Sequence, residues 1–200
     1  AYGAGTLYDF EEVTLDKFID SNTALPYIDS LVIGNLYGDT QAAICLPNTP
    51  GYNSEIAFGF NVGGACGDAS WVDGTEQEAA LAGVHATSDI FAPFGEGPVI
   101  VPTTNEFVVN VAGTRAAIQY ANDSGNNDIF NSIPVESDPL AAAIDVQIEE
   151  DVTLYTGQTL KLGTENFYAF KTPFPQGSPW DWWDYNVLAG TVAFINGQLG

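Results

Sequence analysis

Apolar and polar residues alternate over several short stretches of this chain, as they do in half-buried β-strands. Within residues 55–62, every second residue from Ile56 to Val62 is apolar, and the residues between them are small or polar. Similar patterns predict strands at residues 31–37, 98–102, 106–111, 144–148, 166–171 and 187–195, and a strand pair with a turn at Gly157 over residues 152–163.

Turn-forming Gly, Pro, Asn and Asp residues separate these stretches. Residues 75–84 and 114–121 have the spacing of short helices, and Leu15, Phe18 and Ile19 suit one short helical turn within residues 11–20. Many short strands bounded by turns predict an all-β protein, an antiparallel β-sandwich or jelly-roll-like domain with one or two short helices. No composition shift marks a linker, so we expect one domain over residues 1–200, with residues 1–10 as an extended N-terminal arm that contacts a neighbouring subunit.

The charge balance narrows the choice of partners. The chain carries 26 acidic residues against 4 Lys and Arg, which gives a formal net charge of −22. So few basic residues cannot neutralise phosphates, which argues against nucleic-acid partners and against binding to anionic membranes. Repulsion between carboxylates weakens at high salt, so the composition indicates either a saline or calcium-containing setting outside the cytoplasm, or simply a soluble surface.

Hydropathy argues against membrane insertion. No stretch approaches the roughly 20 apolar residues that a membrane-spanning helix needs. The first residues lack the basic and apolar regions of a signal peptide, so we expect the chain to begin after signal cleavage or after removal of an initiator Met.

Two cysteines, Cys45 and Cys66, lie near the ends of apolar runs. The turn-rich segment 47–54 lies between them, so the two runs are expected to be neighbouring strands. A disulfide between them would stabilise the fold by roughly 3 kcal/mol in the chain-entropy model. It would also favour an extracellular, periplasmic or virion-surface location. Two buried thiols are the alternative.

Catalytic equipment is scarce. His85 is the only histidine, so a nucleophilic site with a histidine base would have to use it. Neither a Gly-x-Ser-x-Gly motif nor a phosphate-binding glycine loop is present in the sequence. We therefore interpret His85 as structural and expect no enzymatic activity. A secreted acidic hydrolase is the weakest alternative, because 26 acids always allow some carboxylate pair.

Calcium is the ligand that the composition favours. Residues 122–128 place Asp123, Asn127 and Asp128 around Gly125, and such a turn supplies the oxygen ligands that Ca²⁺ prefers. The full twelve-residue EF-hand spacing is missing, and a solvated turn would have the same composition. Asn122 begins the only Asn-x-Ser/Thr motif, so it is the predicted glycosylation site if the protein is secreted.

An aromatic cluster lies near the C-terminus, formed by Trp180, Trp182, Trp183 and Tyr185. Exposed aromatic side chains beside Asp181 and Asp184 would stack on sugar rings. The same side chains would anchor a subunit interface, where Trp and Tyr contribute much of the binding energy. Burial under a long loop is the third alternative.

Together these features favour a structural role. The leading hypothesis is a non-enzymatic subunit of a self-assembling extracellular filament or virion coat, whose copies join by addition of a β-strand to a neighbour. The alternative is a secreted carbohydrate-binding module that uses the aromatic cluster at 180–185. We expect no cofactor other than Ca²⁺.

Overall fold

The computed structural model describes residues 18–27, 56–74, 78–101, 103–133 and 139–177. Within these ranges β-strands dominate, and four small sheets are accompanied by two short α-helices. The elements are β1 (Ile19–Asp20), β2 (Leu25–Pro26), β3 (Phe58–Val62), β4 (Ala65–Cys66), η4 (Ala69–Trp71), β5 (Ala80–Ala86), β6 (Glu96–Ile100), β7 (Phe107–Gly113), α3 (Thr114–Asp123), η5 (Asp128–Ser132), α4 (Pro139–Glu149), β8 (Asp151–Thr153), β9 (Thr159–Lys161) and β10 (Phe167–Phe170).

The central sheet is parallel, with the strand order β10-β5-β3. We had expected antiparallel pairing, which occurs in β1–β2, in β4-β7-β6 and in β8–β9. An alternating pattern does not encode strand direction, and residues 63–79 are longer than the dozen or so residues that a parallel crossover needs. The described strands therefore form several sheets, and they do not make one clear sandwich or jelly roll.

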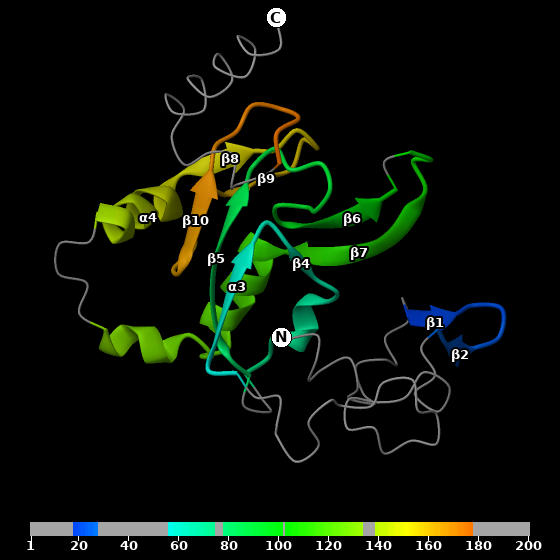
Figure 1. Cartoon of the computed structure of the whole chain (residues 1–200), viewed down its shortest axis with the longest axis horizontal. Helices are drawn as coiled ribbons and strands as arrows, with labels where there is room; N and C mark the ends of the chain where they lie inside the picture. Colours follow the sequence, from blue (N-terminus) through cyan, green and yellow to red (C-terminus); the bar gives the residue numbers. More distant parts are fainter. Residues whose placement is uncertain (1–17, 28–55, 75–77, 102, 134–138, 178–200) are drawn as a thin grey trace, which may run out of the picture.

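Helix α3, whose position at 114–121 was predicted, covers one face of the parallel sheet (Figure 1). Its residues Ile118 and Ala121 are completely buried. In β5, a Cβ on Gly83 would lie 2.5 Å from the Asn61 carbonyl oxygen and 2.8 Å from Thr114 Cγ2. The close contact between helix and sheet therefore requires glycine at this position. The surrounding core consists of Val72, Leu81, Phe94, Leu154, Leu162, Phe167 and Ala169.

Two predicted elements were wrong. Residues 144–148 alternate like a strand but belong to helix α4, because the preceding Ala-rich run favours a helix. The less exposed positions on this helix recur every three to four residues, and Val146 is 68% exposed. Residues 75–84 were expected to be helical, but strand β5 begins at Ala80. Its small side chains fit between the flanking strands and α3.

The other predicted strands that fall on described residues were confirmed. They are β3, the β6–β7 pair, the β8–β9 pair and β10. Within the described part of the chain, no helix is long and apolar enough to cross a membrane. The predicted strands at 31–37 and 187–195 lie outside the described residues.

Substituting Gly113, which links β7 to α3, should test how tightly this connection is packed. A Cβ at Gly113 would lie 1.7 Å from the Pro93 carbonyl oxygen, so we expect Gly113→Ala to lower the free energy of unfolding by about 3 kcal/mol or more. In the control Gly157→Ala, a Cβ meets nothing within 4 Å but the residue has φ +84°, so we expect a loss of about 1 kcal/mol. Urea unfolding measures both, and equal losses would contradict the packing described here.

Candidate functional site

Strand β3 forms one edge of the parallel sheet and exposes apolar side chains. Its sequence alternates Phe58, Phe60 and Val62 with Gly59 and Asn61, so the three larger side chains share one face. These three residues are 49%, 57% and 39% exposed. Among the described strands, none pairs with the outer side of β3. Within the described part of the chain, this side of the sheet is therefore an open, apolar edge.

The backbone of β3 shows which groups point outward. Gly63 donates its N–H to the Val84 carbonyl oxygen at 2.9 Å. In a parallel ladder alternate residues bond to the neighbouring strand, so the odd-numbered residues of β3 face β5. The N–H and C=O groups of Phe58, Phe60 and Val62 consequently point away from β5, where a further strand would meet them.

The opposite edge of this sheet, β10, is closed by a side chain. Ala169 donates its N–H to Gln147 Oε1 at 2.8 Å, and Gln147 Nε2 donates to the Ala169 carbonyl oxygen at 2.9 Å. The amide thus forms the two hydrogen bonds that another strand would form. Gln147 is buried on α4, which runs alongside β10 (Figure 1). Strand addition at this edge is blocked.

The antiparallel sheet β4-β7-β6 has poor edges for strand addition. β6 contains Pro98, which has no N–H to donate, and Glu96, which brings a charge to the edge. β4, at the other edge, comprises only two residues. Among the longer edge strands that the structure describes, β3 is therefore the one without protection.

The exposed apolar face extends beyond β3. In the parallel register Val62 lies beside Val84, and Tyr168 lies on the other side of Val84, so all three strands contribute apolar residues to the face opposite α3. The ring centroid of Phe58 lies 6.4 Å from that of Phe60 and 5.8 Å from that of Phe130. The face is aromatic and carries no charge on β3.

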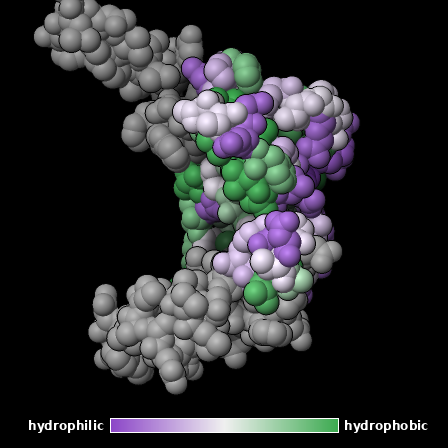
Figure 2. Space-filling model, turned by 90° about the vertical axis from the view of Figure 1, so that its right-hand side faces the viewer, coloured by the Kyte–Doolittle hydropathy of each residue, from purple (hydrophilic) through white to green (hydrophobic). Residues whose placement is uncertain are grey.

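Apolar residues also reach the surface elsewhere. Figure 2 views the molecule from the side on which β6 and β7 lie in Figure 1, and it shows hydrophobic residues among hydrophilic ones there. Phe107 and Val108, at the start of β7, are 62% and 55% exposed. They lie on a different sheet from Phe60, where β7 pairs with β6 on one side, and β4 pairs only with Ala112 and Gly113 on the other.

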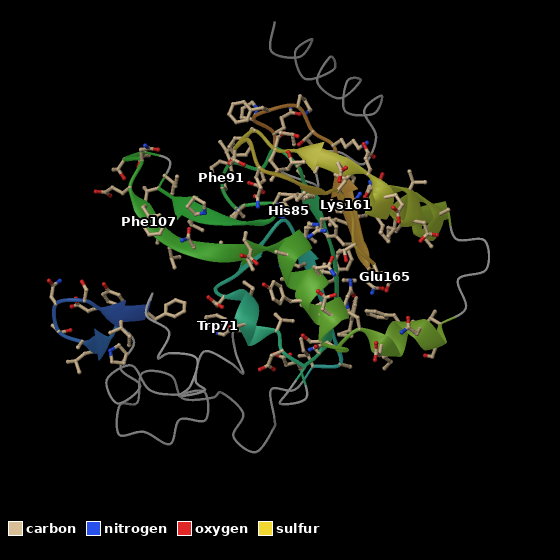
Figure 3. All side chains as sticks on the ribbon, turned by 180° about the vertical axis from the view of Figure 1, so that it is seen from behind. Trp71, His85, Phe91, Phe107, Lys161 and Glu165 are labelled. Carbon is tan, nitrogen blue, oxygen red and sulfur yellow. The ribbon has the colours of Figure 1, made fainter. Side chains whose placement is uncertain are left out.

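His85 lies in the interior, whereas Phe107 lies at the projecting end of β7 (Figure 3). The Nε2 of His85 is 3.1 Å from Asp89 Oδ2, and the Nδ1 of His85 is buried without a hydrogen-bond partner. The neighbouring Ser88 Oγ donates to the Thr172 carbonyl oxygen at 2.6 Å, so this hydroxyl is not directed at the histidine. The geometry gives His85 a structural contact that joins β5 to the turn after it.

The Asp89 carboxylate organises that turn. Its Oδ1 accepts hydrogen bonds from the N–H groups of Phe91 at 2.8 Å and Ala92 at 3.1 Å. Burial raises the pKa of Asp89, but the hydrogen bonds from His85 and from these two N–H groups outweigh it, so the pKa lies below its ordinary value of 3.8. The charged form of Asp89 therefore stabilises the fold.

A pocket of about 520 Å³ lies between η4, β6, β7 and α3, and its lining includes Asp68, Ser70, Glu96, Asn110 and Tyr120. The charge of Glu96, followed by burial, raises the pKa of the Tyr120 hydroxyl. The two carboxylates give the pocket a negative potential. Nevertheless, in the described ranges no group of three or more His, Cys, Asp and Glu side chains could hold a metal ion.

Two of the predicted calcium ligands make contacts within the fold. Asp123 Oδ1 accepts a hydrogen bond from Gln119 at 2.9 Å, and Asp128 is exposed at the start of η5. Asn127 is buried, and its Oδ1 accepts the Leu81 N–H at 2.7 Å. Asn127 thus joins the segment after α3 to β5, and calcium binding there stays a prediction.

Asn122, the predicted glycosylation site, is held within the fold. Its Nδ2 donates to Thr164 Oγ1 at 3.0 Å and to the Glu165 carbonyl oxygen at 2.9 Å. Its Oδ1 accepts a hydrogen bond from Asn127 Nδ2 at 2.5 Å. Because a glycan replaces one of the two hydrogens on Nδ2, glycosylation would require at least one of these two hydrogen bonds to break.

Several predicted sites fall outside the described residues. They are the N-terminal arm at 1–10, Cys45 and the aromatic cluster Trp180, Trp182, Trp183 and Tyr185. Cys66 lies on β4 with its Sγ 3.1 Å from the Asp68 carbonyl oxygen. The disulfide and the carbohydrate-binding surface stay predictions.

Gln147 is the functional residue that the sequence pattern missed. It lies between Val146 and Ile148 in an Ala-rich helix, and a single amide among apolar residues is the signal that could have found it. Comparison with known proteins adds no further residue: no protein-family model, curated protein or solved structure matches this chain.

Removing the Gln147 amide should destabilise the sheet. Gln147→Ala leaves the N–H and C=O groups of Ala169 without partners, so we expect the free energy of unfolding to fall by about 2 kcal/mol. Gln158→Ala, in the exposed turn between β8 and β9, is the matched control and should change it by less than about 0.5 kcal/mol. If urea unfolding gives equal values for both variants, the amide does not close the edge.

The Asp89 carboxylate predicts a pH dependence. Because its pKa is lower in the folded state, its contribution to stability is full well above 3.8 and is lost as the pH falls through the folded pKa. We expect Asp89→Asn to destabilise the protein by about 2 kcal/mol at pH 7, and the difference from the unaltered protein should shrink below about pH 4. Asp145→Asn, on the exposed side of α4, provides the same charge change as a control. A difference that stays constant from pH 7 to pH 3 would contradict this role.

Proposed function

We propose that this protein is a non-enzymatic structural subunit whose copies assemble by β-strand addition at the open edge of β3. The observation that carries the proposal is the contrast between the two edges of the parallel sheet. Gln147 occupies the hydrogen-bonding groups of β10, whereas β3 directs the groups of Phe58, Phe60 and Val62 outward. Exposed apolar edges of this kind pair with other strands unless they are protected.

The composition supports assembly under ionic conditions that screen charge. Two copies with a net charge of −22 each repel one another at low salt. The Debye length falls to about 3 Å at 1 M salt, which removes most of this repulsion while hydrophobic association persists or strengthens. An extracellular filament or a virion coat in a saline or calcium-containing setting fits these conditions.

The proposal concerns the whole chain as a single β-rich domain over residues 1–200. An antiparallel sandwich or jelly-roll-like arrangement of that whole chain stays part of the proposal, although the described central sheet is parallel. Residues 1–10 of a neighbour are one segment that would supply the added strand. The acceptor edge supports assembly whichever segment supplies that strand.

A charged residue at the centre of the edge tests the proposal. We expect Phe60→Lys to weaken self-association at 1 M salt by about 10- to 100-fold, because burial of a phenylalanine contributes about 1.5–3 kcal/mol. Sedimentation velocity over a concentration series measures the association. Phe107→Lys, which makes the same change at the exposed end of β7, is the matched control and should leave association unchanged.

Two results would contradict the proposal. The unaltered protein could remain monomeric at every salt and calcium concentration, or Phe60→Lys and Phe107→Lys could assemble equally well. Far-UV circular dichroism of both variants confirms that the comparison is made between folded proteins.

A further inference from the structure

The proposed function leaves open which strand meets the edge of β3. We infer that the occupant is β3 of a second copy, paired antiparallel about a two-fold axis that passes through Phe60. This inference rests on the proposed function and adds the partner and the register to it.

The hydrogen-bonding groups of β3 are self-complementary in this arrangement. Phe60 would face Phe60 of the second copy, and Phe58 would face its Val62. Phe58, Phe60 and Val62 direct their N–H and C=O groups away from β5. Each of these residues would therefore form a hydrogen-bonded pair with the residue that it faces. A shift by one residue would place outward groups opposite inward ones, and a shift of the axis to Asn61 would leave Phe58 without a facing partner. The register centred on Phe60 is therefore the one that satisfies the whole edge.

The side chains are equally compatible. A two-fold axis perpendicular to the sheet keeps the Phe58, Phe60 and Val62 side chains of both copies on one face, opposite α3. Aromatic and β-branched residues then face one another across the new strand pair, which is a favourable combination. The result is a continuous sheet of six strands, with β10 at each end closed by its own Gln147.

Charge favours a second copy over other partners. The sequence contains no charged residue between Glu55 and Asp68, although the chain as a whole carries 26 acids. A basic partner would be attracted to the acidic surface elsewhere, and this neutral segment offers it no carboxylate. A second copy can approach here because its matching segment is neutral as well. The contact is short, so we expect a dimer that depends on concentration and strengthens with salt.

Cysteine cross-linking of the full-length protein at 1 M salt tests the register. In a hydrogen-bonded antiparallel pair the Cα atoms lie about 5.5 Å apart, within the range for a disulfide. We expect Phe60→Cys to cross-link with itself on oxidation, and Phe58→Cys to cross-link with Val62→Cys when the two are mixed. Phe58→Cys alone should cross-link several times less, because its two copies would lie roughly 14 Å apart. The unaltered protein, oxidised in the same way, reports any contribution from Cys45 and Cys66.

The outcomes separate the inference from the proposed function. If Phe58→Cys cross-links with itself better than with Val62→Cys, the pairing is parallel and the inference is wrong. If deletion of residues 1–10 abolishes association, the N-terminal arm supplies the strand, and the inference is again wrong while strand addition stands. If the unaltered protein never associates, both are wrong.

Hydrogen exchange of the unaltered protein gives a measurement that no substitution can disturb. At 1 M salt, the amides of Phe58, Phe60 and Val62 should exchange more slowly as the protein concentration rises through the dimer range. Exchange that is independent of concentration at these three amides, in a sample that sedimentation shows to be associated, would overturn the inference.

Discussion

The pairing of β5 on both of its sides is the constraint on which the rest of this structure depends. Parallel strands are normally buried and fully paired, and β5 meets this requirement through β3 and β10. The outer edges of β3 and β10 then have backbone groups that also need hydrogen-bond partners. At β10 the chain supplies Gln147 from α4, which fixes the helix beside the strand. At β3 no described residue has a comparable role, so the outward backbone groups of this strand are left exposed among the described residues.

The sequence pattern located the strands but not their directions. Alternation identified β3 and β10 correctly because on both strands the side chains of one face are less exposed than those of the other. Whether neighbouring strands run parallel depends on the connections between them, which hydrophobic periodicity does not record. The pattern also failed at α4, where Ile144, Val146 and Ile148 fit a period of two although the Ala-rich run favours a helix.

Hydrophobic alternation also predicts only part of the candidate site. An open sheet edge was expected, and the apolar face of β3 could be read from Phe58, Phe60 and Val62. The closed edge, β10, could not be predicted from the sequence. Its closure depends on a contact between Gln147 and Ala169, which lie on different elements. At the turn 122–128, the sequence did not show that Asn127 accepts the Leu81 N–H, because this contact joins residues far apart in the chain. Calcium binding at this turn stays a prediction.

In the proposed assembly, the charged groups and the subunit contact lie on different parts of the surface. Lys161 and Lys171 each contact a carboxylate, Asp151 and Glu150 respectively, so they cannot offset the acids elsewhere. A two-fold contact through neutral β3 strands avoids this charge, but it is closed and joins only two copies. A filament or coat therefore needs a second contact of a different kind. Among the described edges β10 and β6 resist strand addition, so in the proposed assembly the described residues would supply this contact by side-chain packing. The apolar face of a joined six-stranded sheet is the surface where salt would favour that packing.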